Sequence, residues 1–251
     1  MNKWKKKENY RLYHTILSCL TLGWLVLVPN AQAELSADLT IASKYLFRGI
    51  DYSDSQPVLQ SSVQYAHSSG FYLGSWFSNA GMPERVLTDK EGNLLRDKNN
   101  SPIDAGSSNG SGFEIDLYTG YTASRGDFSY SLGLAGYYYP EANASPLASD
   151  SYEFSLGAGY KSYSTTLYIN LEPDVYDDYK YLSIDGPVGP LLGHLGTTLY
   201  GKSDGYSDVS VSYNFTPRLS WSLVYAFGDA IVADSSQDDP VIVVSYKVPL
   251  D

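Results

Sequence analysis

The sequence predicts an all-β protein, namely a transmembrane, antiparallel, up-and-down β-barrel of about 12 strands that follows an N-terminal signal peptide. Three observations support this prediction. Apolar and polar residues alternate with a period of two along most of the chain, which indicates strands with two different faces. The connections between these strands are alternately longer and shorter, as in outer-membrane barrels. Charged residues make up only 18% of a chain that contains 24 tyrosines and 22 glycines, which excludes a disordered acidic chain.

Residues 1–33 have the pattern of a secretory signal peptide. Five basic residues precede an uncharged, mostly apolar stretch from Thr15 to Val28, and Ala31-Gln32-Ala33 is an Ala-x-Ala cleavage site. The stretch is shorter than the roughly 20 residues that a membrane-spanning helix needs. We therefore expect residues 34–251 to form the mature barrel domain. Cys19, the single cysteine, lies in the leader, so no disulfide framework or cysteine metal site is expected.

Twelve candidate strands follow in order. In the first, Leu35, Leu39 and Phe47 belong to the apolar face and alternate with a mostly polar one. The alternation is ambiguous in the third, eighth and ninth candidates. The expected strands are 35–48, 58–66, 71–79, 113–123, 128–139, 151–160, 164–171, 179–184, 191–200, 207–215, 219–227 and 241–248.

The connections divide the expected barrel into two ends. The six longer ones are 49–57, 80–112, 140–150, 172–178, 201–206 and 228–240, and their formal charges sum to −13; the five short turns sum to +1. Long external loops and tight periplasmic turns are typical of outer-membrane barrels, and an even strand count places both termini in the periplasm. Tyrosine and tryptophan near the strand ends indicate interfacial girdles. A secreted β-sandwich or soluble barrel is the alternative.

Several short motifs resemble a known family. The segment Ser43-Lys44-Tyr45-Leu46-Phe47-Arg48-Gly49, followed by Ser53, Pro57 and Gln60, resembles the opening of the TorF-type porin family of bacterial outer-membrane proteins, as do 67–74 and 136–140. The resemblance covers most of the mature chain, although residues 82–110 form a longer stretch than the family usually carries. It implies a barrel and a porin role, and it supplies neither a substrate nor an established site.

Five charged residues on the expected lumen face form the candidate site. A first strand running outward to residue 48 would place Arg48 near the outer rim and Lys44 deeper. Strands running inward from the same rim would place Glu114, Asp116 and Glu153 nearby. Opposed acidic and basic side chains create a constriction in porins. The same residues could equally form ion pairs that plug a small lumen, since a barrel of about twelve strands is narrower than a sixteen-stranded one.

The predicted function is a narrow channel in the bacterial outer membrane for passive diffusion of small polar solutes or ions, weakly selective for cations because the outer loops are acidic. The alternatives are a structural or adhesive barrel with a plugged lumen and a lipid-modifying enzyme. An enzyme of this kind needs a histidine near the outer leaflet, but His67 lies in an expected periplasmic turn, and His194 has no recognisable nucleophile motif around it. No cofactor or metal site is expected, because the acidic loop clusters match no EF-hand spacing.

The expected partners follow from this location. They are outer-membrane lipids and lipopolysaccharide, the barrel-assembly machinery during insertion, and the diffusing solutes or ions. A nucleic-acid partner is not expected, because the formal net charge is −11 and no basic stripe follows the first few residues.

Overall fold

The computed structural model describes residues 33–80, 112–139, 151–171, 180–199, 205–228 and 239–250. The expected signal peptide lies outside the described residues, apart from Ala33, and so does nearly all of the long 80–112 connection. The acidic clusters of the 172–178 and 228–240 connections also lie outside them, with the exception of Asp239. Within these ranges no helix is long and apolar enough to cross a membrane.

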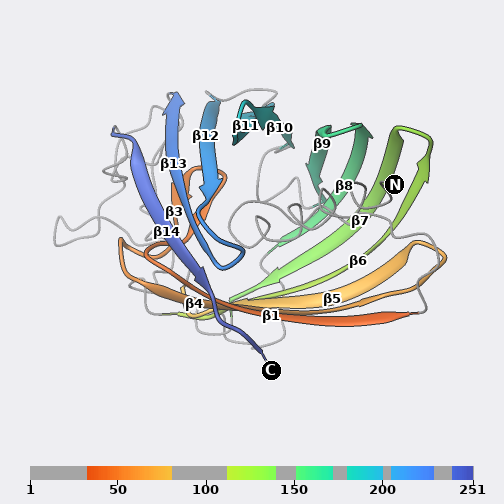
Figure 1. The fold of residues 1–251 in the computed structure, drawn as a ribbon, viewed down its shortest axis with the longest axis horizontal. Coiled ribbons are helices and arrows are strands. Elements are labelled where there is room, and N and C mark those ends of the chain that lie inside the picture. Colours follow the sequence, from red (N-terminus) through yellow and green to blue (C-terminus); the bar gives the residue numbers. More distant parts are fainter. Residues whose placement is uncertain are drawn as a thin grey trace, which may run out of the picture.

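Twelve strands form a closed antiparallel barrel in which every strand pairs with its neighbours in the chain (Figure 1). The barrel closes between the first and last strands through three register pairs, from Thr40↔Lys247 to Ala42↔Ser245. The strands are β1 (Glu34–Ala42), β4 (Val58–Ala66), β5 (Phe71–Ser78), β6 (Glu114–Arg125), β7 (Phe128–Tyr138), β8 (Ser151–Tyr160), β9 (Tyr163–Asn170), β10 (Lys180–Val188), β11 (Leu191–Thr198), β12 (Tyr206–Asn214), β13 (Leu219–Gly228) and β14 (Val241–Lys247). The predicted antiparallel β-barrel of about 12 strands is therefore confirmed, whereas the signal peptide stays a prediction.

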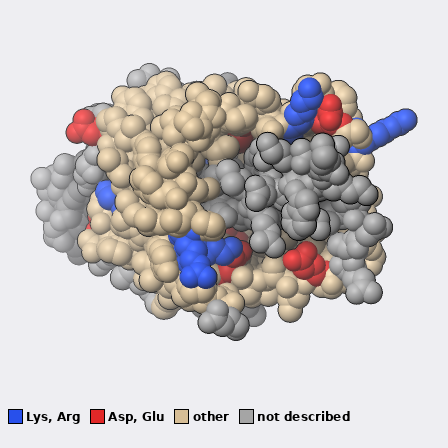
Figure 2. Space-filling view, in the orientation of Figure 1, with Lys and Arg blue, Asp and Glu red and all other residues tan. Residues whose placement is uncertain are grey.

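The alternation of the sequence separates an apolar outer face from a polar lumen. Leu132, Leu156 and Leu223 are 47%, 41% and 36% exposed on the outside, whereas Ser183 and Ser210 are buried on the inside. Successive side chains of a strand point to opposite faces, so one register satisfies both environments. Figure 2 shows one face of the molecule, on which most described atoms belong to neither acidic nor basic residues. Such a surface is suited to contact with lipid tails.

The two ends of the barrel differ as the connection lengths predict. Two residues join β6 to β7, β8 to β9 and β10 to β11, and Gly126 and Gly189 in these turns have φ of 63° and 61°. Glycine adopts this left-handed conformation without steric cost. We call this the short-turn end. The connections after β1, β5, β7, β9, β11 and β13 are longer and lie at the opposite end, which we call the long-connection end.

Two strand boundaries differ from the prediction by four residues or more. The first strand was expected to run to residue 48, but β1 ends at Ala42. The chain then turns into a short hairpin of β2 (Leu46–Phe47) and β3 (Ile50–Asp51), which pair only with each other. The eighth strand was expected to end at residue 184, but β10 continues to Val188.

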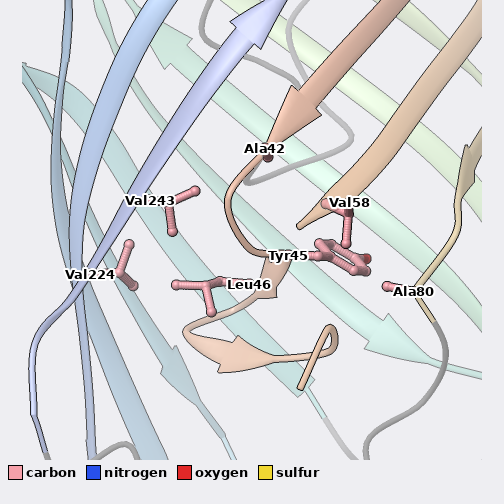
Figure 3. Close-up of a cluster of buried hydrophobic side chains, with 7 residues drawn as sticks. All are labelled: Ala42, Tyr45, Leu46, Val58, Ala80, Val224 and Val243. Atoms are coloured by element: carbon pink, nitrogen blue, oxygen red, sulfur yellow. The ribbon is translucent and has the colours of Figure 1, made fainter. Parts of the chain in front are cut away.

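The hairpin from Leu46 to Asp51, which we call the inward hairpin, lies inside the barrel. Leu46 points toward Val224 and Val243 of the barrel wall, and Tyr45 points toward Val58 and Ala80 (Figure 3). All six of these side chains are at most 5% exposed. The apolar alternation that extends through residue 47 therefore does not continue a membrane-facing strand. It packs the hairpin against an apolar patch on the lumen wall, where burial of apolar area stabilises it.

The tip of the inward hairpin is held close to the opposite wall. Arg48 and Gly49 have φ of 50° and 79°, the pattern of a two-residue turn that needs positive φ at both positions. A Cβ atom on Gly49 would lie 2.7 Å from the Cβ of Asp208 and 2.9 Å from the Cβ of Ala226. Only glycine leaves room for the backbone at this position, so the tip is in van der Waals contact with β12 and β13.

Candidate functional site

Arg48 at the tip of the inward hairpin forms a two-pronged ion pair with Glu153 of β8. The Nη1 and Nη2 atoms of Arg48 each donate a hydrogen bond of 2.7 Å, to Oε1 and Oε2 of Glu153 respectively. Both side chains are only 5% exposed. Parallel paired hydrogen bonds between guanidinium and carboxylate are strong and directional. The pair therefore links the hairpin to the barrel wall in one orientation.

Aromatic side chains enclose this ion pair. The guanidinium carbon of Arg48 lies 4.7 Å from the ring centroid of Phe47, 4.6 Å from that of Tyr168 and 4.5 Å from that of Tyr181. The hydroxyl of Tyr137 donates a 2.7 Å hydrogen bond to Oε2 of Glu153. Cation–π attraction is strongest where water is excluded, so the surroundings favour a charged Arg48 at this position.

Glu114 and Asp116 lie side by side on the lumen face of β6, where they are 1% and 4% exposed. The hydroxyl of Tyr139 donates a 3.0 Å hydrogen bond to Oε1 of Glu114. Tyr45 and Asp116 are also neighbours of this carboxyl group. Among the described residues, no hydrogen-bond partner reaches Oε2 of Glu114 or Oδ1 of Asp116. This leaves two buried carboxyl oxygens facing the polar interior without a donor.

A third group of polar side chains surrounds His194 on the lumen face of β11. Nδ1 of His194 lies 2.6 Å from Oδ1 of Asp185, and Nε2 lies 3.0 Å from both Tyr181 Oη and Asp208 Oδ2. The Tyr181 hydroxyl in turn donates a 2.7 Å hydrogen bond to Oδ1 of Asp208. Tyr181 also stacks on Arg48, so this group adjoins the ion pair at the hairpin tip.

Sequence reasoning missed the His194 group for an identifiable reason. The eighth strand was expected to end at residue 184, which assigned Asp185 to a turn. The longer β10 instead pairs Asp185 directly with His194 in register. The alternation of Ile184 with its neighbours, followed through to Val188, is the sequence signal that would have placed Asp185 on the lumen face.

Four of the five predicted site residues lie at one level of the lumen, but Lys44 does not join them. Arg48 meets Glu153, and Asp116 is close enough to both Glu114 and Glu153 to interact electrostatically. Lys44 was expected to lie deeper on the first strand. It instead follows the end of β1 and binds Ser55 Oγ at 2.8 Å and Asp51 Oδ2 at 3.7 Å. The reason is that β1 ends before residue 44.

The arrangement places a layer of opposed charges across the lumen near the long-connection end. Arg48 comes from the hairpin, and carboxyl groups come from three different wall strands, at Asp116, Glu153 and Asp208. A transverse arrangement of this kind can orient and select charged solutes at a narrow point. Because these side chains are buried, they also fill the lumen at this level.

Comparisons with solved structures find barrels of low sequence identity. A KdgM porin has 9% identity and a TM-score of 0.45 over 87% of this chain and 100% of that chain. Outer membrane phospholipase A from Escherichia coli has 13% identity and a TM-score of 0.44 over 86% and 95%. An anion-selective porin from Comamonas acidovorans has 13% identity and a TM-score of 0.30 over 86% and 98%. At these similarities, the assignment of the fold rests on the strand pairing described above.

The sequence itself matches one family. No curated protein matches the chain. The family model described as a bacterial protein of unknown function (Gcw_chp) matches residues 28–233, which include eleven of the twelve barrel strands and the inward hairpin. The TorF-type resemblance stays a prediction. The chain belongs to the Gcw_chp family of bacterial proteins of unknown function.

Proposed function

We propose that the protein is a narrow outer-membrane channel for passive diffusion of small polar solutes or ions, weakly selective for cations, whose lumen is constricted by the inward hairpin. The observation that carries the proposal is the hairpin itself. A segment that leaves the wall at Ala42, enters the lumen and pairs Arg48 with Glu153 narrows the space that the strands enclose. Its position inside a polar barrel favours a role in controlling which solutes or ions pass through the lumen.

The composition of the lumen supports a polar, cation-preferring path. On the short-turn side of the hairpin, the inner face carries small side chains, among them Ser131 and Gly133, which leave room for water. At the constriction, carboxyl groups outnumber the cationic groups Arg48 and His194. A net negative field between low-dielectric walls concentrates cations and repels anions.

The test compares channel currents of two proteins in planar bilayers. One is the wild type, and the other has residues 44–53 replaced by a Gly-Ser linker of equal length. We expect small currents from the wild type and a larger unitary conductance from the linker variant, because the occluding hairpin is gone. A Gly-Ser replacement of the turn 67–70, at the short-turn end, is the matched control and should conduct like the wild type. Conductance unchanged by the hairpin replacement would contradict the proposal.

A second candidate is a plugged barrel with a structural or adhesive role. The observation in its favour is the burial of the charged layer, in which Arg48, Glu114 and Glu153 are at most 5% exposed. This candidate expects no current from the wild type under any applied voltage. The wild-type current therefore decides between the two candidates.

An outer-membrane lipid-modifying enzyme is the third and least supported candidate. Hydrolytic triads use one histidine nitrogen to activate a nucleophile, but both ring nitrogens of His194 contact Asp185, Asp208 and Tyr181 inside the lumen. We expect no phospholipid turnover by the folded protein. If any turnover is measured, a His194→Ala change should not abolish it. The described residues also contain no group of three or more His, Cys, Asp or Glu placed to hold a metal ion.

The expected cellular setting belongs to the same proposal. Removal of residues 1–33, periplasmic termini, insertion by the barrel-assembly machinery and contact with lipopolysaccharide all accord with a barrel whose outer face is apolar. Accessibility of an epitope at the C-terminus, present only after the outer membrane is permeabilised, would support this orientation.

A further inference from the structure

Among the residues that the structure describes, no cationic side chain pairs with Glu114 or Asp116 on β6. Both side chains are at least 96% buried, and Oε2 of Glu114 and Oδ1 of Asp116 have no hydrogen-bond partner among the described residues. Burying a carboxylate without compensation is strongly unfavourable. The neighbouring Glu153 is satisfied differently, because it receives two hydrogen bonds from Arg48 and one from Tyr137.

Arg48, the arginine that the structure describes at this level, is directed to Glu153. Both of the Arg48 nitrogens that bond Glu153 do so at 2.7 Å, and its guanidinium is stacked between aromatic rings. Lys44, the other cation near the hairpin, is directed to Asp51 and Ser55. In the described part of the chain, the titratable groups that interact with the pair from other elements include Tyr45, Tyr137, Tyr139 and Glu153, and none of these carries a positive charge.

We infer that Glu114 and Asp116 form a binding site for a partly dehydrated, oxygen-preferring metal cation on its way through the channel. Carboxylate oxygens are the ligands that such hard cations prefer, and the hydroxyls of Tyr139 and Tyr45 add neutral oxygens beside them. With only two carboxylates, the site is too sparse for a resident metal ion. Conduction requires binding that is weak enough for the ion to leave, which a site of this composition provides.

The inference rests on the proposed channel function and gives it a substrate class. The first experiment measures reversal potential under a KCl gradient, and block of the K⁺ current by Ca²⁺, for the wild type and for the Glu114→Gln/Asp116→Asn variant. We expect the variant to lose most of its cation preference. We also expect its half-blocking Ca²⁺ concentration to rise by about tenfold or more, the scale on which metal sites weaken when a supporting group is removed.

A matched control separates this site from the general negative field. Asp38→Asn also removes lumen charge, but Asp38 is half-exposed and paired with Lys247. The control should keep the wild-type selectivity and Ca²⁺ block. If Asp38→Asn lowers both as much as the double variant, or if the double variant conducts with unchanged selectivity and block, the site does not bind cations and the two carboxyl groups share a proton instead.

Absence of any current would count against the channel function alone. A binding measurement tests the cation site in that case as well. The probe is Tb³⁺ luminescence of the folded protein in detergent, sensitised by tyrosines such as Tyr139 next to the site. The wild type and Asp38→Asn should show a saturable component that Ca²⁺ displaces, and the double variant should lack it. Equal saturable binding by all three proteins would overturn the inference.

Discussion

Replacing Arg48 by alanine is the most informative test of how the hairpin is held. In the folded protein, both guanidinium hydrogen bonds to Glu153 are 2.7 Å long and both side chains are 5% exposed. Removing the arginine leaves a carboxylate buried at the tip of the hairpin, to which, of the side chains in the described ranges, the Tyr137 hydroxyl alone then donates. The inward hairpin would then keep its apolar contacts and lose its directional link to β8.

The expected cost can be estimated from the burial. Breaking a buried ion pair by removing one partner costs about 3–5 kcal/mol, because an uncompensated charge is left behind. Loss of the stacking of Arg48 on Tyr168 and Tyr181 also destabilises the folded protein, and adds about 0.5–2 kcal/mol to the cost. A solvent-exposed pair of the same residues would contribute about 0–1 kcal/mol. The magnitude of the loss therefore reports whether water reaches the constriction.

The assay is a double-mutant cycle of Arg48→Ala and Glu153→Ala, with the free energy of unfolding measured by urea titration in lipid vesicles. Fluorescence of Trp76 follows the hairpin, because its ring lies 5.2 Å from that of Tyr45. We expect each single variant to lose about 3–5 kcal/mol and the pair to couple by about 2–3 kcal/mol. A single-variant loss below about 1 kcal/mol would refute the reasoning, since it would indicate a hydrated, open lumen around the pair.

Three further predictions test the faces, the orientation and the hairpin tip. Leu132→Arg on the lipid face should cost about 2–4 kcal/mol in vesicle folding titrations, whereas Ser131→Arg on the lumen face should cost less than about 1 kcal/mol; the reverse would shift the register by one residue. A cysteine replacing Ser124 at the short-turn end should react with an impermeant maleimide only after the outer membrane is permeabilised, and labelling of intact cells would invert the topology. Gly49→Ala should destabilise by more than Gly126→Ala, because both have positive φ but only Gly49 would push a Cβ into the barrel wall; equal unfolding free energies of the two variants would exclude tight contact at the tip.

The surroundings of Gly133 show how closely the inner face of the barrel is packed. Gly133 on the lumen face would tolerate serine if the lumen there were simply open. A Cβ at Gly133 would however contact Ser155 Oγ and lie 3.2 Å from the hydroxyl of Tyr72. Small residues on the inner face therefore make room for tyrosine side chains from neighbouring strands as well as for water.

The sequence by itself determined the barrel, because its evidence is local. Period-two alternation fixes which side chains face lipid, and a register error of one residue would reverse every face, so Leu132 and Leu156 could be assigned outward without coordinates. Turn length follows equally locally from residues such as Gly126 and Gly189, whose conformational freedom permits two-residue connections. Those features specified strand number, order and the two different ends.

The tertiary structure alone decided what fills the lumen. Apolar residues alternate through Phe47 in the same way whether the segment continues a membrane strand or packs on a lumen wall. The local sequence therefore does not distinguish the inward hairpin from a longer first strand. Its position depends on Val224, Val243 and Glu153, which lie more than 100 residues away in the chain. The joining of Asp185, His194 and Asp208 spans fewer residues of the chain, but it needs the register of three strands. Alternation specifies a face for each side chain, but only the closed barrel determines which residues meet across the interior.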